Sequence, residues 1–165
     1  MTDITLRYQQ VADARRFWEI LNHPDFIHWP AKPRTVAEER AFLRQTRNKK
    51  QRNLEHNFAI LQEGEILGAV GVMIDQRRPH IGEVGYFVAR EFWGQGIAPR
   101  AVSLIEAFIR EKLDLHRIEI TVLKPNRMSC RVAEKCGYRK EGIQRGKIKT
   151  DDGYLDVYAY AKILS

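Results

Sequence analysis

A short segment with two glycines, between an apolar strand-like run and an amphipathic helix, constrains this chain more than any other feature. The segment reads Glu91-Phe92-Trp93-Gly94-Gln95-Gly96-Ile97-Ala98-Pro99-Arg100. A strand that turns through glycines into a helix start leaves several backbone N–H groups unpaired and directed at one place. Such a group of donors suits a pyrophosphate. The sequence therefore predicts that a phosphorylated ligand binds at this turn.

Length and composition indicate one globular domain, residues 1–165, large enough to bury an apolar core without disulfides or metals. No apolar run reaches the roughly 20 residues of a membrane span, and the first residues lack a secretion-signal pattern, so we expect a cytoplasmic location. Cys130 and Cys136, six residues apart, and the five histidines show no metal-ligand spacing. We therefore expect reduced thiols and no metal site.

The chain carries 28 Lys and Arg against 21 Asp and Glu, a net charge of +7. This excess favours encounter with anions such as nucleic acid, the ribosome surface or a phosphate-rich cofactor. A well-solvated surface is the simpler interpretation of most of these charges. The dense basic cluster at residues 44–52 lies at the end of an expected helix, where the helix dipole also favours cations.

Hydrophobic periodicity and turn residues predict a mixed α/β chain. The expected elements, in order, are a strand at 4–8, a helix at 11–21, a helix from about Thr35 to the basic cluster, a hairpin of strands at 58–61 and 66–72, a strand at 80–88, a helix at 97–109, a strand at 117–123, a helix from Asn126 to Gly137, and an antiparallel pair at 138–144 and 154–163. A full helix separates the strands at 80–88 and 117–123, so these two can lie parallel. The order predicts a mixed sheet with helices on its faces.

Four segments of the chain occur in a recognisable order. They are Gly85-Tyr86-Phe87-Val88, Trp93-Gly94-Gln95-Gly96-Ile97-Ala98, Asn126-Arg127-Met128-Ser129 and Gly137-Tyr138-Arg139-Lys140-Glu141-Gly142. Together they resemble the GCN5-related N-acetyltransferase (GNAT) superfamily, and most of all its RimJ/RimL-like branch of ribosomal-protein N-terminal acetyltransferases. The resemblance covers nearly the whole chain. It implies the GNAT fold, a mixed and mostly antiparallel sheet of six to seven strands with a splayed parallel pair and helices on both faces.

The resemblance also implies acetyl-coenzyme A as the acetyl donor, a primary amine as the acceptor, and direct attack in a ternary complex. The strands at 80–88 and 117–123 would splay to form a slot for the pantetheine arm. Backbone groups of Phe87 and Val88 would bind pantetheine, and one N–H there could polarise the thioester carbonyl. The pyrophosphate would be held by the amides of Gly94, Gln95, Gly96, Ile97 and Ala98, with Arg100 as a helper and Asn126 as a further contact. An ordinary tight turn is the structural alternative for the glycines.

Two positions depart from the superfamily pattern. Glu91 stands where Gln or Arg is usual, and phosphates would repel its carboxylate, so we expect it to point away. Ala133 stands where many members carry a tyrosine that protonates the departing thiolate. The proton donor must therefore be another group or water.

Acetyl transfer to an amine needs a neutral nucleophile, a polarised carbonyl and a proton for the thiolate. Glu83 lies alone among apolar neighbours on the strand that forms the slot, and it is the candidate base. A solvent-facing glutamate on an alternating strand is its structural alternative. Ser129 matches the serine of the RimL-like Asn-x-x-Ser pattern and is the candidate proton donor. A first-turn helix residue that satisfies a backbone group is the alternative there.

The acceptor is expected to meet the last strand and an aromatic loop. The candidates on the strand are Tyr154, Asp156 and Tyr158, which could offer a cationic amine an aromatic and acidic face. They could also form the outer face of a strand packed under a helix or loop, the interpretation that we favour for Tyr160. The resemblance places Phe26 and Trp29 beside the acceptor groove, although a tryptophan can equally fold over the edge of a core.

Two functions from different classes are compatible with these patterns. The first is an N-acetyltransferase acting on a protein N-terminus or on a small amine such as a polyamine. The second is a basic RNA- or ribosome-binding protein with acyl-coenzyme A as a regulator and little or no catalysis, which would need a contiguous basic and aromatic surface. We expect no membrane partner and no nucleic acid, and the resemblance is compatible with a homodimer. A shallow open groove facing the sulfur would favour peptide N-termini, and a closed acidic pocket would favour a polyamine.

Overall fold

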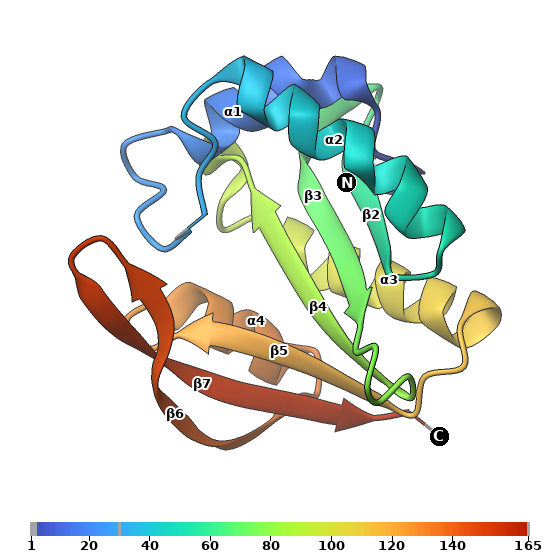
Figure 1. Ribbon diagram of the computed structural model, residues 1–165, viewed down its shortest axis with the longest axis vertical. Helices are drawn as coiled ribbons and strands as arrows, with labels where there is room; N and C mark the ends of the chain where they lie inside the picture. The colour runs from blue at the N-terminus through green and yellow to red at the C-terminus, as the bar shows by residue number, and fades with distance from the viewer. Residues whose placement is uncertain (1–2, 30, 165) are drawn as a thin grey trace.

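A computed structural model describes residues 3–29 and 31–164. Its centre is one seven-stranded sheet in the order β1-β2-β3-β4-β5-β7-β6 (Figure 1). The strands are β1 (Thr5–Tyr8), β2 (Glu55–Gln62), β3 (Glu65–Ile74), β4 (Ile81–Val88), β5 (Arg117–Leu123), β6 (Arg139–Thr150) and β7 (Gly153–Ile163). Neighbouring strands run antiparallel except for β4 and β5, which are parallel. The mixed α/β fold with one parallel pair, expected from the sequence, is confirmed.

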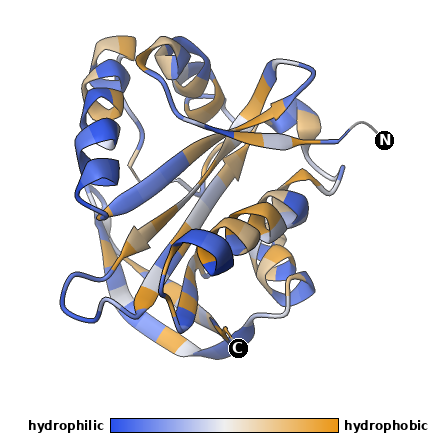
Figure 2. Ribbon diagram, turned by 90° about the vertical axis from the view of Figure 1, so that its right-hand side faces the viewer, coloured by the Kyte–Doolittle hydropathy of each residue, from blue (hydrophilic) through white to orange (hydrophobic). Residues whose placement is uncertain are grey.

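Helices cover both faces of the sheet. They are α1 (Ala14–Leu21), α2 (Val36–Gln51), α3 (Ile97–Lys112) and α4 (Arg127–Lys135), with short 3-10 helices η1 (Val11–Asp13) and η2 (Arg90–Phe92). α1 and α2 lie on one face, and α3 and α4 lie on the other (Figure 1). Apolar and polar residues alternate around these helices (Figure 2), as amphipathic packing requires. Among the described residues, no helix combines the length and hydropathy that a membrane span needs.

Local sequence signals explain where several elements begin. The Thr35 hydroxyl accepts the Glu38 N–H at 3.1 Å and caps α2, while the Glu38 carboxylate accepts the N–H of Arg34 at 2.7 Å. Glu63 and Gly64, both with positive φ, form the two-residue turn between β2 and β3. These capping and turn residues fix the ends of the elements that surround the slot.

The sheet separates two apolar clusters. One lies between the sheet and α3, and it contains Val84 and the buried residues of α3 at 97, 101, 102, 105 and 109. The other lies under α1 and α2, and Phe87 packs against it. Successive side chains of a strand point to opposite faces, so Glu83 shares the α1–α2 face with Phe87. β4 therefore presents its apolar side to α3 and carries its one carboxylate on the opposite face.

The parallel pair opens into a fork. β4 and β5 pair only at Ile81↔Arg117, Gly82↔Ile118 and Glu83↔Glu119. Beyond these three pairs β4 continues beside β3 and β5 continues beside β7, and the two strands diverge toward the loop segment at residues 22–29 (Figure 1). Backbone N–H and C=O groups that face the gap consequently lack a strand partner and can bind an extended ligand.

The final hairpin is longer than the sequence indicated. β6 continues to Thr150 instead of ending near Gln144, and its ladder with β7 is irregular between Gln144 and Ile148. The added residues are mostly exposed and charged, because β6 is an edge strand. Such a segment has no apolar alternation from which a strand could be predicted.

Candidate active site

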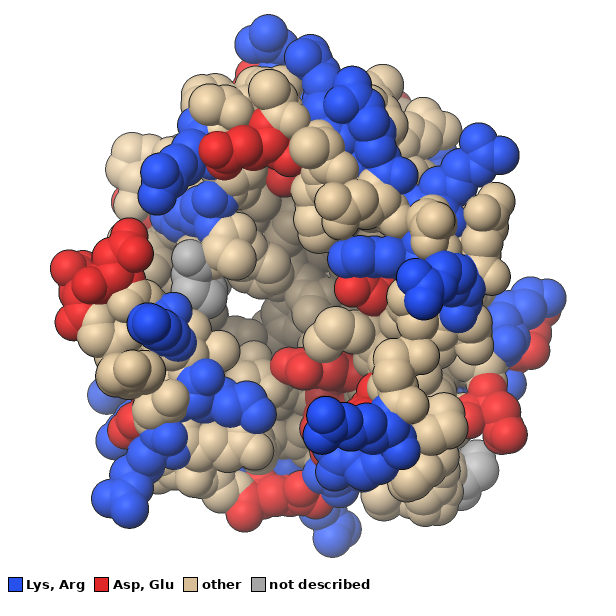
Figure 3. Space-filling view, viewed as in Figure 1, with Lys and Arg blue, Asp and Glu red and all other residues tan. Residues whose placement is uncertain are grey.

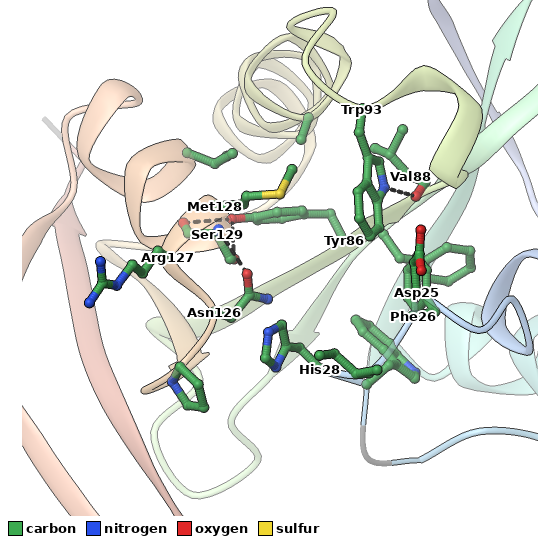
Figure 4. Close-up of a pocket in the computed structure, with 16 residues that line it drawn as sticks. Asp25, Phe26, His28, Tyr86, Val88, Trp93, Asn126, Arg127, Met128 and Ser129 are labelled. Carbon is green, nitrogen blue, oxygen red and sulfur yellow. Dashed lines mark hydrogen bonds between the residues drawn. The ribbon is translucent and has the colours of Figure 1, made fainter.

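The fork contains a cavity of about 370 Å³. Its walls come from the loop at 25–29, the end of β4 at 86–88 and the start of α4 at 125–129 (Figure 4). The space-filling view shows a hollow that passes through this part of the molecule (Figure 3). Three segments that are distant in the chain thus enclose the slot that the resemblance implied.

The glycine turn offers free donors at the start of α3. Gly94 and Gly96 both have φ of 76°. Apart from the adjoining residues, no atom lies within 4 Å of the position that a Cβ would take at either glycine. The backbone N–H groups of Gly94, Gln95 and Gly96 donate no hydrogen bond to another described residue. Ile97 and Ala98 occupy the first turn of α3, where N–H groups have no partner within the helix. The turn therefore forms an open cradle of donors at a positive helix end.

Two charged side chains near this cradle are held by other parts of the chain. The Glu91 carboxylate accepts a 2.6 Å hydrogen bond from Arg16 on α1, and this contact lowers the pKa of Glu91. Glu91 is thus drawn toward α1, as we expected from its charge. Arg100 forms an ion pair with Asp3 at 3.0 Å from the first turn of α3. An anion in the cradle would compete with Asp3 for this guanidinium.

The backbone N–H and C=O groups of successive β4 residues point alternately toward β3 and toward the gap. Ala89 donates to the Leu67 carbonyl on β3 at 2.7 Å, and the antiparallel ladder then turns the backbone groups of Tyr86 and Val88 toward the gap. The indole N–H of Trp93 donates a hydrogen bond to the Val88 carbonyl at 2.7 Å. Val88 is left with its N–H at the slot, whereas Phe87 meets the cavity through its ring.

A pair of hydroxyls lies on the wall of the slot. Tyr86 Oη and Ser129 Oγ share a 2.8 Å hydrogen bond, and Tyr86 also lies 3.3 Å from the Ser129 carbonyl (Figure 4). The Asn126 side chain accepts the Ser129 N–H at 3.1 Å, so it caps α4 and orients the serine. Burial raises the pKa of Tyr86 to about 12, which keeps the phenol protonated. Tyr86 was missed from the sequence, because its spacing from Ser129 shows no motif.

Glu83 lies where the fork closes. It lines a cavity of about 220 Å³ between β4 and β5, and also a neighbouring cavity on the α1–α2 face. Its partner across the parallel pair, Glu119, is held by Arg117 at 2.7 Å. No hydrogen bond or ion pair joins the Glu83 carboxylate to another described side chain. Glu83 is therefore a free carboxylate close to the slot.

The predicted acceptor residues are not all brought together. Phe26 is buried and packs edge-on against the Phe87 ring at 6.1 Å, which anchors the loop. Trp29 also meets the Phe87 ring edge to face, with ring centroids 5.3 Å apart, and it lines all three cavities around the fork. Both residues therefore stand beside the slot.

The residues on β7 lie elsewhere. Tyr158 faces α4 beneath the ammonium of Lys140, Asp156 accepts the Gly146 N–H at 2.9 Å, and Tyr154 is exposed. Within the described chain, none of these three lines a cavity that contains Glu83. The alternate face of β7 does so through Val157, together with Ile148 of β6. Tyr160 is buried and donates to Glu134 at 3.0 Å, which agrees with a structural role.

Ala133 is the fully buried residue of α4, so the position of the usual tyrosine supplies no proton donor. Cys130 and Cys136 are free thiols. Burial raises the pKa of Cys136, which favours its protonated form. Among the described residues on the wall of the slot, the Tyr86–Ser129 pair and the His28 imidazole carry groups that can donate a proton there.

Comparison with known proteins agrees with this geometry. A family model described as an acetyltransferase (GNAT) domain matches residues 3–139. The probable N-acetyltransferase YjcK of Bacillus subtilis (strain 168) is 31% identical over 125 residues, 74% of this chain and 69% of that protein. The ribosomal-protein-serine acetyltransferase of Escherichia coli (strain K12) is 26% identical over 144 residues, 87% of this chain and 77% of that protein. The structure of Mycobacterium smegmatis RimJ in complex with CoA-disulfide has a TM-score of 0.86 at 24% identity, covering 97% of this chain and 81% of that one. Since the family model spans most of its length, the chain belongs to the GNAT acetyltransferase family.

Proposed function

We propose that residues 1–165 form a single N-acetyltransferase domain that transfers an acetyl group from acetyl-coenzyme A to the α-amino group of a protein N-terminus. The observation that carries this proposal is the fork, with a free carboxylate at its closed end and a hydroxyl pair on its wall. The similarity to a ribosomal-protein-serine acetyltransferase supports a protein acceptor.

The residues of the slot fit acetyl-coenzyme A, which when bound supplies the activated acetyl group. The amides of the cradle at 94–98 would hold its pyrophosphate, because glycine lets the backbone approach phosphate closely. The Val88 N–H would donate to the thioester carbonyl and stabilise negative charge on that oxygen. A RimJ structure with the same fold contains a coenzyme A disulfide, which supports this assignment.

Glu83 would act as the general base. An α-ammonium group must lose a proton before it can attack a carbonyl, and a nearby carboxylate can accept that proton directly or through a water molecule. Glu83 can do so because no cation among the described residues is paired with it, and because it lines the cavity at the closed end of the fork.

Ser129 would donate the proton that the departing thiolate needs. Its hydroxyl lies on the slot wall, held by Asn126 through the backbone and by Tyr86 through the side chain. When the Tyr86 phenol donates to Ser129 Oγ, the serine hydrogen is free to point into the slot. Tyr86 is then a positioning residue, and Ser129 touches the reacting atoms.

Thiol release from acetyl-coenzyme A, measured with short peptides that have free N-termini, tests the proposal. We expect Glu83→Gln to lower kcat about 100-fold or more while the affinity for coenzyme A stays unchanged, as removal of a general base predicts. Glu65→Gln, an exposed carboxylate at the start of β3, is the matched control and should leave turnover unchanged. Unchanged turnover in Glu83→Gln would remove Glu83 from the mechanism. Coenzyme A binding without acetylation of any peptide would contradict the protein acceptor.

A further inference from the structure

A second cavity, of about 360 Å³, opens on the α1–α2 face of the sheet. It shares Trp29, Glu83 and Tyr86 with the cavity at the closed end of the fork. Its remaining wall comes mainly from α1, α2, β2 and β3 and from the segment after β1, and it includes Gln9, Glu39, Phe42, Glu55 and Met73. An acceptor whose amine reaches Glu83 can therefore extend into this cavity.

The walls of this cavity carry carboxylates and no cation. Glu39, Glu55 and Glu83 line it, whereas no lysine or arginine among the described residues does. Lys49 binds Glu55 at 2.9 Å but is not part of the wall. The cavity thus differs in sign from the chain as a whole, whose net charge is +7.

Two acceptor groups inside this cavity lack donors. Glu39 is only 6% exposed, and no hydrogen bond or ion pair joins its carboxylate to another described residue. Burial accordingly raises the pKa of Glu39. The side-chain oxygen of Gln9 is also buried and has no hydrogen-bond partner. Buried polar atoms are nearly always paired in folded proteins, so the Gln9 oxygen calls for a donor from outside the chain. The unpaired Glu39 carboxylate in the same cavity wall favours a cationic donor.

We propose that this cavity is a second cation site for the acceptor, in which Glu39 and the Gln9 amide oxygen bind a positively charged group next to the reacting amine. For an acceptor that is a protein N-terminus, this group is a lysine side chain at the second or third position. The inference rests on the proposed function and names the class of N-terminus that the enzyme selects. A cation supplies both the N–H donors and the opposite charge that Glu39 lacks.

Matched peptides test the site by binding, independently of turnover. The probes are Ser-Lys-Ala-Ala amide and Ser-Ala-Lys-Ala amide, with norleucine in place of lysine as the uncharged controls. Calorimetry with the coenzyme A-loaded protein measures each dissociation constant, and thiol release measures kcat/KM. We expect one of the lysine peptides to bind about tenfold or more tightly than its norleucine control, as a hydrogen bond between charged groups predicts.

Glu39→Gln should abolish this preference and leave the affinities for coenzyme A and for the norleucine peptides unchanged. Glu19→Gln, an exposed carboxylate on the neighbouring helix α1, removes the same charge and should keep the preference. The Glu39→Gln variant should fold, because it relieves a buried unpaired carboxylate, and its thermal unfolding checks this. Should it fail to fold, the wild-type preference and a Gln9→Leu variant, which removes the other oxygen, still test the site.

Equal binding of lysine and norleucine peptides to the wild type would overturn the site, as would no binding of any of them. A preference that survives in Glu39→Gln would also overturn it. If lysine peptides bind preferentially but none is acetylated, the proposed function fails while the cation site stands. The two failures are therefore distinguishable in one set of measurements.

Discussion

At the scale of single residues, the hydroxyl pair of Tyr86 and Ser129 makes a specific kinetic prediction. If Tyr86 acts only by positioning Ser129, Ser129→Ala should lower kcat by about 100-fold and Tyr86→Phe by less. The double variant should then resemble Ser129→Ala alone, since groups that act as a unit are not additive. Thiol-release kinetics measure this, with Tyr138→Phe as control, a buried tyrosine that does not line the slot. Additive losses would show that the two hydroxyls act independently.

His56 gives a pH-dependent prediction far from the slot. Its ring accepts from the Tyr8 hydroxyl at 3.0 Å and donates to Asn53 at 2.7 Å, in the tautomer that these partners require. Burial, and then the charge of Lys50, lower the pKa of His56 below its ordinary value near 6.5. The unfolded chain therefore binds the proton more readily than the folded one. His56 contributes stability that is present above pH 6.5 and is lost as the pH falls through its folded pKa.

Thermal unfolding at pH 8 and pH 5.5 checks this sign. The melting temperature of the wild type should fall between these two values by more than that of His56→Gln, which cannot gain the proton. His116→Gln, an exposed histidine, is the control and should behave as the wild type does. An equal fall in all three proteins would show that other groups set the acid stability.

At the scale of elements, the conformational role of the glycine turn can be distinguished from its role in binding. Gly96 precedes α3 with φ of 76°, and Gly64 in the β2–β3 turn has φ of 83°, with open space at both Cβ positions. Replacement of either by alanine should cost about 1–2 kcal/mol of stability, because an L-residue is strained there.

Only Gly96→Ala should also weaken coenzyme A binding, since its methyl group would lie in the cradle, whereas Gly64 is remote from it. Denaturant unfolding and calorimetry measure the two effects separately. Equal coenzyme A affinity in both variants would remove Gly96 from the binding site.

The elements that flank this turn show which parts of the fold a sequence can predict. α3 was predictable because its buried residues follow one helical stripe, and β5 because its alternation is clean. The outer half of β6 was not, because an exposed edge strand selects charge instead of apolar alternation. Which β7 side chains are buried depends on which helix covers each face of the sheet. The periodicity of the sequence alone therefore could not predict that Val157, and not Tyr158, faces the cavity lined by Glu83.

The same distinction between local patterns and long-range packing applies to the candidate site. The phosphate cradle is contiguous in the chain and is visible as a motif, and Ser129 comes with the helix cap at Asn126. Tyr86 and Glu39 gain their roles from partners and cavities formed by distant elements. No local pattern marks a tyrosine as the partner of a serine 43 residues away, or a helical glutamate as unpaired.

At the scale of the whole molecule, basic and acidic side chains gather in different places. Lys124, Arg127, Arg131 and Lys140 gather around Tyr158 in an open hollow beside α4, and the Lys140 ammonium lies 3.4 Å from the centre of the Tyr158 ring. A basic exterior attracts anionic partners, while the acidic cavity attracts cations. The RNA- or ribosome-binding function stays a prediction, and salt-dependent RNA affinity would test it separately from acetyl transfer.

The fork itself makes the last prediction. The two arms of the sheet are joined by three β4–β5 residue pairs, by the packing of α3 on α4 and by the hydrogen bond between Tyr86 and Ser129. Both β4 and α4 form walls of the slot between the arms. A ligand that fills the slot must therefore contact both arms. Coenzyme A at about 100 times its dissociation constant should stabilise the protein by about 2.7 kcal/mol, or roughly 5–10 °C in melting temperature.

Hydrogen exchange locates this stabilisation. Amides at 86–88 on β4 and at 127–130 on α4 should exchange more slowly with coenzyme A bound, together with those of the cradle. The opposite edge strand β1 is separated from β4 by β2 and β3 and should be unchanged at residues 5–8. Protection confined to the cradle would mean that the turn binds phosphate while the fork stays empty. Protection of both arms would agree with a ligand that bridges them, because the strand pairing between β4 and β5 ends at Glu83 and Glu119.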